Sequence, residues 1–132
     1  MVIDTSAVIA IVTGESEREI FAHIVAAEPR TTMSAVSFHE ASIVTAGKIG
    51  VQGGARRVDE FIRNMQIEIA ASTFEDALVA REAYFRYGRG YHTARLNLAD
   101  CFAYALAKVR DEPLLFKGDD FSKTDIVPAW RP

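Results

Sequence analysis

The fold class is decided by one stretch near the N-terminus, Val2-Ile3-Asp4-Thr5-Ser6-Ala7-Val8-Ile9-Ala10-Ile11-Val12. The short apolar run that begins at Val2 and ends in the acid Asp4 predicts a strand, and the apolar run from Ala7 to Val12 predicts a helix. Only the polar pair Thr5-Ser6 separates them. A strand followed at once by a helix is the beginning of a βα unit, and such units build parallel sheets.

Strands and helices alternate along the rest of the chain. Several helix starts carry capping motifs: Ser16 to Glu19 has the S-x-x-E pattern, and Thr73 and Asn97 are each followed by an acid three residues later. The segments between the short strands are long enough for crossover helices, so we expect a largely parallel sheet covered on both faces, in a single domain of residues 1–132. The expected helices run from Ser16 to Ala27, from Ser34 or Ser37 to Lys48, from Ala55 to Asn64, from Thr73 to Tyr87 and from Asn97 to Val109, and the further strands are Arg30 to Met33, Gln66 to Ala71, Leu114 to Phe116 and Asp125 to Val127.

Composition narrows the function classes. The chain has 15 Lys and Arg against 18 Asp and Glu, a net charge of −3, which argues against a protein that coats nucleic acid by neutralising phosphates. A nuclease is still compatible with this charge, because bound cations cancel the charge of a metal-binding acid cluster. The single Cys101 and the lack of zinc-type Cys/His spacing point to a reducing cytoplasm. No apolar run is long enough to cross a membrane.

Four acids stand where an open parallel sheet binds its ligands, which is beyond the carboxyl ends of the strands. Asp4 and Asp119 follow predicted strands, whereas Glu40 and Asp100 fall in the first turns of predicted helices. If those helix starts converge on the same edge of the sheet, the four carboxylates meet there.

Each acid also has a structural explanation. Glu40 and Asp100 both stand three residues after a side chain that can cap a helix, so both could be capping acids. Asp119 could form a turn, with Asp120 as the N-cap of the next segment. Asp4 is harder to explain in this way, since a carboxylate at the end of a buried strand needs a partner or a metal ion.

Electrostatics favours one shared site. Two like charges about 4 Å apart repel by roughly 4 kcal/mol at an effective dielectric of about 20. Clustered carboxylates therefore protonate or move apart unless a cation lies between them. Oxygen ligands without Cys or multiple His suit Mg²⁺ or Mn²⁺. One or two such ions can activate water for an in-line attack on phosphorus.

Four pieces of the chain, in order and at compatible spacing, carry a family resemblance: Val2-Ile3-Asp4-Thr5-Ser6-Ala7, Ser37 to Glu40, Leu96 to Ala107, and Pro113 to Phe121 with Thr124-Asp125-Ile126. In these pieces the chain resembles the PIN domain, and more closely its VapC-type toxin ribonucleases. The likeness covers nearly the whole chain, although Gly47 to Asn64 carries none of the motifs.

The resemblance implies a three-layer, Rossmann-like α/β/α sandwich with a central, mostly parallel sheet, whose acids bind Mg²⁺ or Mn²⁺ and cut single-stranded or loop RNA, such as a tRNA or rRNA loop. It also implies inhibition by a small VapB-type antitoxin, and a homodimer. Thr5 or Ser6 would orient a ligand or a water. The fourth acid is Asp119, or else the adjacent Asp120. By motif position, the metal ligands and catalytic acids are Asp4, Glu40, Asp100 and Asp119.

Four basic residues lie around the glycine-containing break before Asn97, and their side chains could reach RNA phosphates near the acids. A solvated basic loop explains the same residues equally well. Tyr87 and Tyr91 could stack on unpaired bases, but packing in the core or in a dimer is the better explanation. The candidate RNA-contacting residues are Arg86, Arg89, His92 and Arg95.

Three alternatives compete with the nuclease. A receiver-like signalling module would share the early acid and the late Lys117, but the strand from Gln66 to Ala71 does not end in the required phosphoacceptor Asp. A haloacid-dehalogenase-like phosphatase needs a second Asp where Ser6 stands. The third alternative is an acid-cluster binding module that cuts no RNA.

Overall fold

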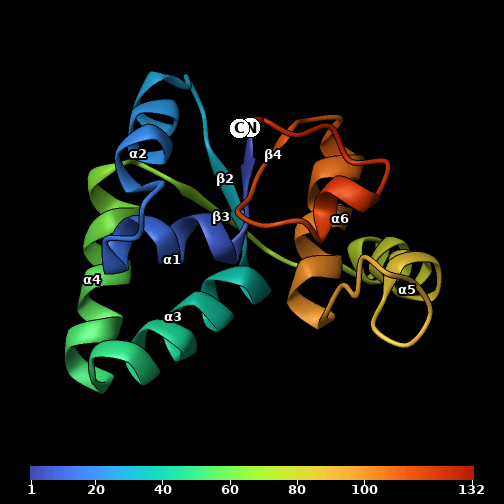
Figure 1. Cartoon of the computed structure of the whole chain (residues 1–132), viewed down its shortest axis with the longest axis horizontal. Coiled ribbons are helices and arrows are strands. Elements are labelled where there is room, and N and C mark those ends of the chain that lie inside the picture. Colours follow the sequence, from blue (N-terminus) through green and yellow to red (C-terminus); the bar gives the residue numbers. More distant parts are fainter.

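Four parallel strands form the centre of the computed structural model, which describes residues 1–132 (Figure 1). Their order is β3-β2-β1-β4, so the direction of the strand order reverses at β1. Such a switch point is where open α/β sheets bind their ligands. The strands are β1 (Val2–Ile3), β2 (Thr32–Ser34), β3 (Glu68–Ala70) and β4 (Leu114–Leu115).

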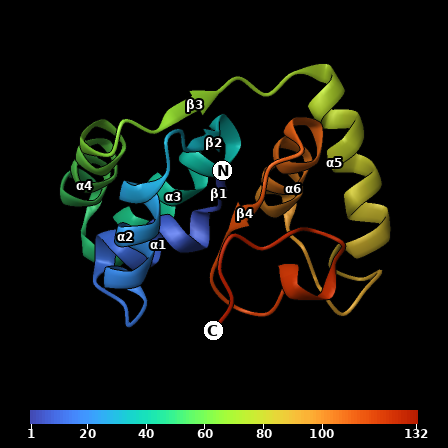
Figure 2. The same cartoon turned by 90° about the horizontal axis from the view of Figure 1, so that it is seen from above.

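Two layers of helices enclose this sheet (Figure 2). Alternate strand residues point to opposite faces: Ile3 and Leu115 pack in the core under α1 to α4, whereas Val2 and Leu114 pack in the core under α5 and α6. The predicted three-layer α/β/α sandwich is thereby confirmed, and none of its helices is both long and apolar enough to cross a membrane. One layer holds α1 (Thr5–Thr13), α2 (Arg18–Ala27), α3 (Ala35–Ile49) and α4 (Val51–Asn64), and the other holds α5 (Phe74–Tyr87) and α6 (Leu98–Arg110).

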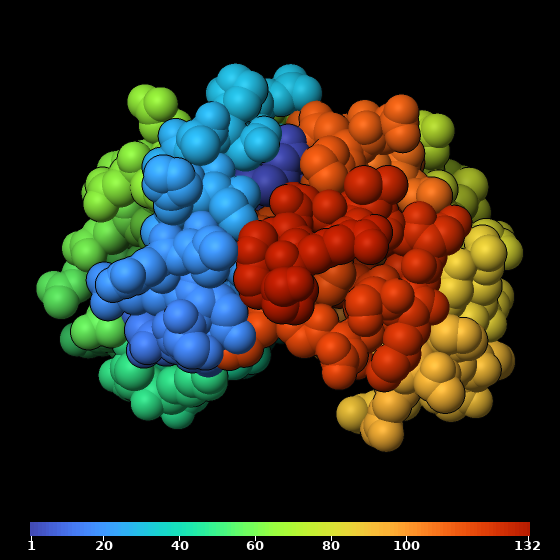
Figure 3. All heavy atoms as spheres, turned by 45° about the horizontal axis from the view of Figure 1, so that its top comes forward, coloured from blue at the N-terminus to red at the C-terminus, as the bar shows by residue number.

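The C-terminal segment runs across one face of the molecule, between the N-terminal helices and α6 (Figure 3). Trp130 packs edge-on against Phe21 of α2, with ring centroids 5.3 Å apart. The strand predicted over Asp125 to Val127 is wrong, because only an isolated bridge joins Leu114 to Pro128. Two hydrogen bonds form this bridge, from the N–H of Leu114 to the carbonyl of Val127 and from the N–H of Ala129 to the carbonyl of Leu114, and a single bridge is too short to make a strand.

Two of the three predicted capping boxes form. Thr73 and Asp76 cap α5 reciprocally, and Asn97 caps α6 with its partner three residues later. The predicted box at Ser16 is wrong: α2 begins after Glu17 without a side-chain cap, and the Ser16 hydroxyl donates to the Glu17 carboxylate at 2.8 Å.

Helix α3 begins at the first of its two predicted starts, Ser34, whereas the start of α4 differs from the prediction. Ser34 caps α3 by accepting a hydrogen bond from the N–H of Ser37, so Glu40 lies beyond the capping position and is not a capping acid. Helix α4 begins at Val51 instead of Ala55, and therefore includes two glycines. A Cβ at Gly54 would stand 2.5 Å from backbone atoms of α3, so glycine here permits a close crossing of the two helices.

Candidate active site

Asp4 lies at the switch point, between the end of β1 and the first turn of α1. Its carboxylate is the N-cap of α1: Oδ2 accepts hydrogen bonds from the N–H of Ser6 at 2.9 Å and from the Ser6 hydroxyl at 2.6 Å. The residue is only 1% exposed, and its other oxygen, Oδ1, is buried without any hydrogen-bond partner. Buried oxygens rarely stay unsatisfied, so this atom marks a place for a positive ligand.

The acids of the site act on one another electrostatically. Burial raises the pKa of Asp4 from 3.8 to about 6, against the lowering effect of the Ser6 hydrogen bonds, and the charge of Glu40 raises it further. Burial raises the pKa of Asp100 to about 7, with additional contributions from Asp4, Glu40 and Asp120. These mutual effects connect Asp4, which follows β1, with Glu40 of α3, Asp100 of α6 and Asp120 of the segment after β4, and this set is called the acidic cluster below.

Asn97 connects two of these acids, a role that the sequence did not reveal. Its backbone N–H donates to Oδ2 of Asp100 at 2.7 Å, and its side-chain Oδ1 accepts from the N–H of Asp100 at 2.8 Å. Its side-chain Nδ2 donates to Oε1 of Glu40 at 3.0 Å. The capping motif predicted the first two bonds, but no local pattern predicted the third, which crosses from α6 to α3.

The two candidates for the fourth acid have different surroundings. Asp120 contributes to the raised pKa of Asp100, which places its charge near the cluster. Asp119 lines a hollow together with Glu17, Lys117 and residues of the C-terminal segment. The structure thus connects Asp120 with the acidic cluster and shows Asp119 at a neighbouring hollow.

The donor set fits a hard divalent cation. No three of the Asp, Glu, His and Cys side chains stand close enough to enclose an ion by themselves. Mg²⁺ is usually held by only one or two carboxylates and keeps several waters, which suits an open arrangement of carboxylate oxygens. The unpartnered Oδ1 of Asp4 is the atom that such an ion would satisfy.

Ser6 and Thr5 have separate roles. The Ser6 hydroxyl accepts a hydrogen bond from the backbone N–H of Lys117 at 3.0 Å, so its own proton is directed to Asp4. Of the two hydroxyls considered as orienting groups, that of Ser6 is the one that contacts the Asp4 carboxylate. The buried hydroxyl of Thr5 donates to the carbonyl of Ser37 at 3.1 Å and joins α1 to α3.

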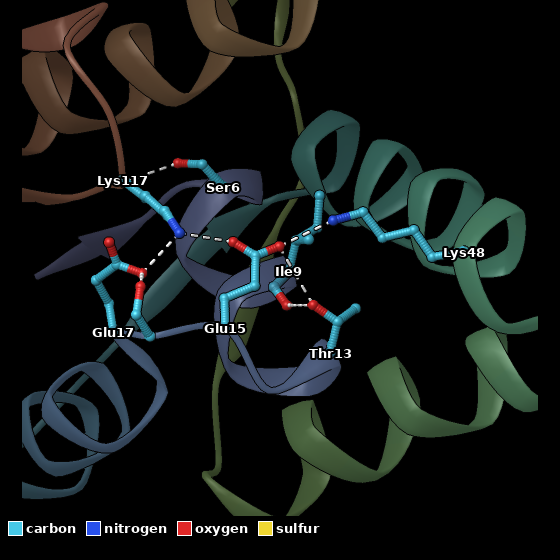
Figure 4. A network of polar contacts seen from close by, with 8 residues as sticks. Ser6, Ile9, Thr13, Glu15, Glu17, Lys48 and Lys117 are labelled. Carbon is cyan, nitrogen blue, oxygen red and sulfur yellow. Dashed lines mark hydrogen bonds and ion pairs between the residues drawn. The ribbon is translucent and has the colours of Figure 1, made fainter.

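An ion-pair network holds the segment after β4 in place (Figure 4). Nζ of Lys117 contacts Glu15 at 2.8 Å and Glu17 at 2.6 Å, and Lys48 of α3 contacts Glu15 at 2.8 Å. Hydrogen bonds from Lys117 and Lys48 lower the pKa of Glu15 to about 2. The ammonium group of Lys117 is thus paired with Glu15 and Glu17 and not with Asp4, whereas the receiver-like role considered for it requires a pair with the early acid.

Two of the four candidate RNA-contacting residues have partners within the protein. Arg86 pairs with Asp125 at 3.6 Å and lies over the ring of Tyr87, 4.8 Å from its centroid. Nδ1 of His92 accepts a hydrogen bond from the N–H of Ala94, and its ring packs edge-on against Tyr87. Arg86 therefore joins α5 to the C-terminal segment, and His92 stabilises the loop between α5 and α6.

The other two basic residues are more available. Arg89 and Arg95 are exposed, and Arg89 lines an apolar groove between α5 and α6 that also includes Asn97. Arg89 therefore lines the same groove as the residue that joins two of the acids. Tyr91 is exposed but packs against neighbouring rings, and Tyr87 is buried in the core, as expected for packing residues.

Comparison with known proteins reveals relatives over the full length. The PIN domain family model matches residues 1–127. A ribonuclease VapC of Mycolicibacterium smegmatis is 47% identical over 127 residues, which cover 96% of this chain and 98% of the relative. Ribonuclease VapC30 of Mycobacterium tuberculosis is 42% identical over 132 residues, which cover all of both chains.

Solved structures show the same fold. The crystal structure of Mycobacterium tuberculosis VapC20, described as a Sarcin-Ricin loop cleaving toxin, has a TM-score of 0.80 at 17% identity and covers 99% of this chain and 98% of its own. A toxin–antitoxin complex from Klebsiella pneumoniae has a TM-score of 0.70 at 16% identity, with the same coverage. Together with the family match and the full-length relatives, these findings show that the chain belongs to the PIN domain family and, within it, to the VapC ribonucleases.

Proposed function

We propose that this protein is a metal-dependent endoribonuclease that hydrolyses RNA phosphodiester bonds and acts as the toxin of a toxin–antitoxin pair. The observation that carries the proposal is the buried Oδ1 of Asp4, which has no partner although three further acids raise the local negative potential. A cation explains how this arrangement persists at neutral pH, because it removes both the repulsion and the unsatisfied oxygen.

Asp4, Glu40 and Asp100 would hold Mg²⁺ or Mn²⁺, with Asp119 or Asp120 as the fourth acid. When bound, such an ion supplies an activated water and stabilises the charge that develops at phosphorus. Asp4 and Asp100 must lose their protons to act as ligands, since their pKa values lie at about 6 and about 7. Ser6 keeps Oδ2 of Asp4 occupied and so leaves Oδ1 for the ion.

The substrate that we propose is single-stranded or loop RNA, as in a tRNA or an rRNA. Arg89 and Arg95 are the candidates for phosphate contacts, because both are exposed and Arg89 lines the same groove as Asn97. The likeness to VapC20, which is described as cleaving the sarcin–ricin loop, supports this substrate class.

A VapB-like antitoxin is the partner that we propose, and a homodimer is the proposed oligomeric state. The groove between α5 and α6 is lined mostly by apolar side chains, and Phe74, Phe85 and Leu98 are exposed on the same two helices. Protein partners commonly cover apolar patches of this kind. The cytoplasm, where RNA and the antitoxin would be met, is the compartment that follows from this proposal.

The test compares cleavage of structured and single-stranded RNA by the purified protein in Mg²⁺, in Mn²⁺ and in EDTA. Asp4→Asn and Asp100→Asn should abolish cleavage while the far-UV circular dichroism spectrum stays that of the folded protein. Asp76→Asn is the matched control, because Asp76 is also an acid in a capping box but lies outside the cluster. It should cut at the wild-type rate.

Other outcomes would count against the proposal. A folded Asp4→Asn protein that cuts as fast as the wild type would exclude the cluster as the active site. Metal-stimulated RNA binding without any cleavage would instead support the alternative of an acid-cluster binding module.

A further inference from the structure

Asn97 is the only hydrogen-bond connection that the structure shows between the acids of α3 and those of α6. Its backbone and carbonyl engage Asp100 within α6, and its amide nitrogen engages Glu40 across the site. Helix α3 belongs to one layer of the sandwich and α6 to the other, and the two meet below the sheet edge (Figure 1). Asn97 therefore joins the two layers where the acids lie.

Capping alone does not require this side chain. Thr73 caps α5 in the same reciprocal way with Asp76, and its hydroxyl has no partner outside that helix start. Ser, Thr and Asp all cap helices about as well as Asn. Among these residues only Asn presents an acceptor and a separate N–H donor at the same time, and both are used at this position.

We propose that Asn97 is a positioning residue of the site, which holds the Glu40 carboxylate toward Asp100 so that both can face one divalent ion. This inference rests on the proposed metal-dependent function. The neutral amide N–H donates to Oε1 of Glu40 at 3.0 Å, so it restrains the carboxylate without competing with the metal for charge. The second oxygen of Glu40 remains for the ion. Groups that orient metal ligands in this way typically change metal affinity by about 10- to 100-fold when removed.

The test replaces the amide and keeps the cap. Asn97→Thr recreates at α6 the box that Thr73 forms at α5, but its hydroxyl cannot both cap the helix and extend to Glu40 as the amide does. We expect the unfolding midpoint in urea to stay close to that of the wild type, and the affinity for Mn²⁺, measured by titration calorimetry, to fall about 10- to 100-fold. Asn97→Ser is a second variant that keeps the cap, should the first one fold poorly.

A matched control and a double-mutant cycle separate positioning from capping. Thr73→Ala removes a cap far from the acids, so it should lower the unfolding midpoint and leave the Mn²⁺ affinity unchanged. If Asn97 acts through Glu40, then Asn97→Thr should have little further effect on Mn²⁺ affinity in a Glu40→Gln background. Equal losses in both backgrounds would mean that Asn97 acts by another route and would overturn the inference.

The outcomes also distinguish this inference from the proposed function. A wild-type protein that binds Mn²⁺ and cuts RNA, together with an Asn97→Thr protein of unchanged Mn²⁺ affinity, would refute the positioning role alone. A wild-type protein without measurable Mn²⁺ binding would refute both.

Discussion

Replacing Asp4 by Asn should stabilise the metal-free protein at alkaline pH, although it removes a residue at the centre of the site. The folded state raises the pKa of this carboxyl from 3.8 to about 6, chiefly by burial. At about 1.4 kcal/mol per pH unit, holding the buried carboxylate ionised costs about 3 kcal/mol, an upper limit for the gain. Asn cannot ionise, and its carbonyl oxygen can still accept both hydrogen bonds from Ser6.

The gain should depend on pH in a defined direction. Because the folded-state pKa is the higher one, the folded protein binds the proton more tightly than the unfolded chain does. Well below pH 4 the carboxyl is protonated in both states, so Asp4→Asn and wild type should be equally stable. As pH rises from about 4 to about 6, the unfolded wild-type chain loses this proton before the folded protein does, so the free energy of unfolding of the wild type falls. At pH 8 the variant should be the more stable protein by up to about 3 kcal/mol. This difference corresponds to a shift of the unfolding temperature on the order of 10 °C.

Urea unfolding measures the effect, with fluorescence of the single Trp130 as the probe, because its ring packs against Phe21. Saturating Mn²⁺ should reduce or reverse the stability difference between variant and wild type at pH 8. An ion at one hundred times its dissociation constant adds about 2.7 kcal/mol to the free energy of unfolding of the wild type. An Asp4→Asn protein less stable than the wild type at pH 8 in EDTA would refute the reasoning, because Asp4 would then be a favourable buried charge.

Three further results are expected. Gly54→Ala should lower the free energy of unfolding by about 3 kcal/mol, because the new Cβ would collide with the α3 backbone. Gly53→Ala lies in open space on the same helix and should raise the free energy of unfolding by up to about 1 kcal/mol. Similar effects of the two changes in urea unfolding would contradict the close crossing of α3 and α4. The affinity for Mn²⁺ should rise between pH 5 and pH 8, with release of protons in calorimetry, because the pKa values of Asp4 and Asp100 lie at about 6 and about 7; a pH-independent affinity would show that other groups bind the ion. Lys117→Met should slow RNA cleavage more than Lys48→Met. The Lys117 side chain anchors the segment after β4, and the backbone N–H of this segment donates to the Ser6 hydroxyl that contacts Asp4, whereas Lys48 lies on α3 and only pairs with Glu15. Equal rates for the two variants would count against this support.

Local pattern sufficed for most elements of the fold. The first predicted strand and the helix after it are present as β1 and α1, and two of the three predicted capping boxes form. These features depend on neighbours within a few residues, so their signal is contained in the sequence window itself. The same holds for the four acids, whose positions at strand ends and helix starts could be recognised before their geometry was known.

Element boundaries were less predictable where distant contacts decide them. Glycines predict breaks, yet Gly53 and Gly54 lie inside α4, since the packing against α3 requires a residue without a side chain at Gly54. Glu40 has the spacing of a capping acid from Ser37, but the helix begins earlier, and the carboxylate is left to face Asn97. In both cases tertiary packing outweighs local preference.

By itself the sequence determined the α/β class and the family, because periodicity and short motifs encode them locally, and it supplied the acids that we propose for the site. Only the tertiary structure decided how those acids are held. The bond from Asn97 to Glu40 joins residues 57 positions apart, and the bond from Lys117 to Ser6 joins residues 111 positions apart. Contacts at such separations exist only after the crossover helices have brought the strand ends together, so no local pattern specifies them.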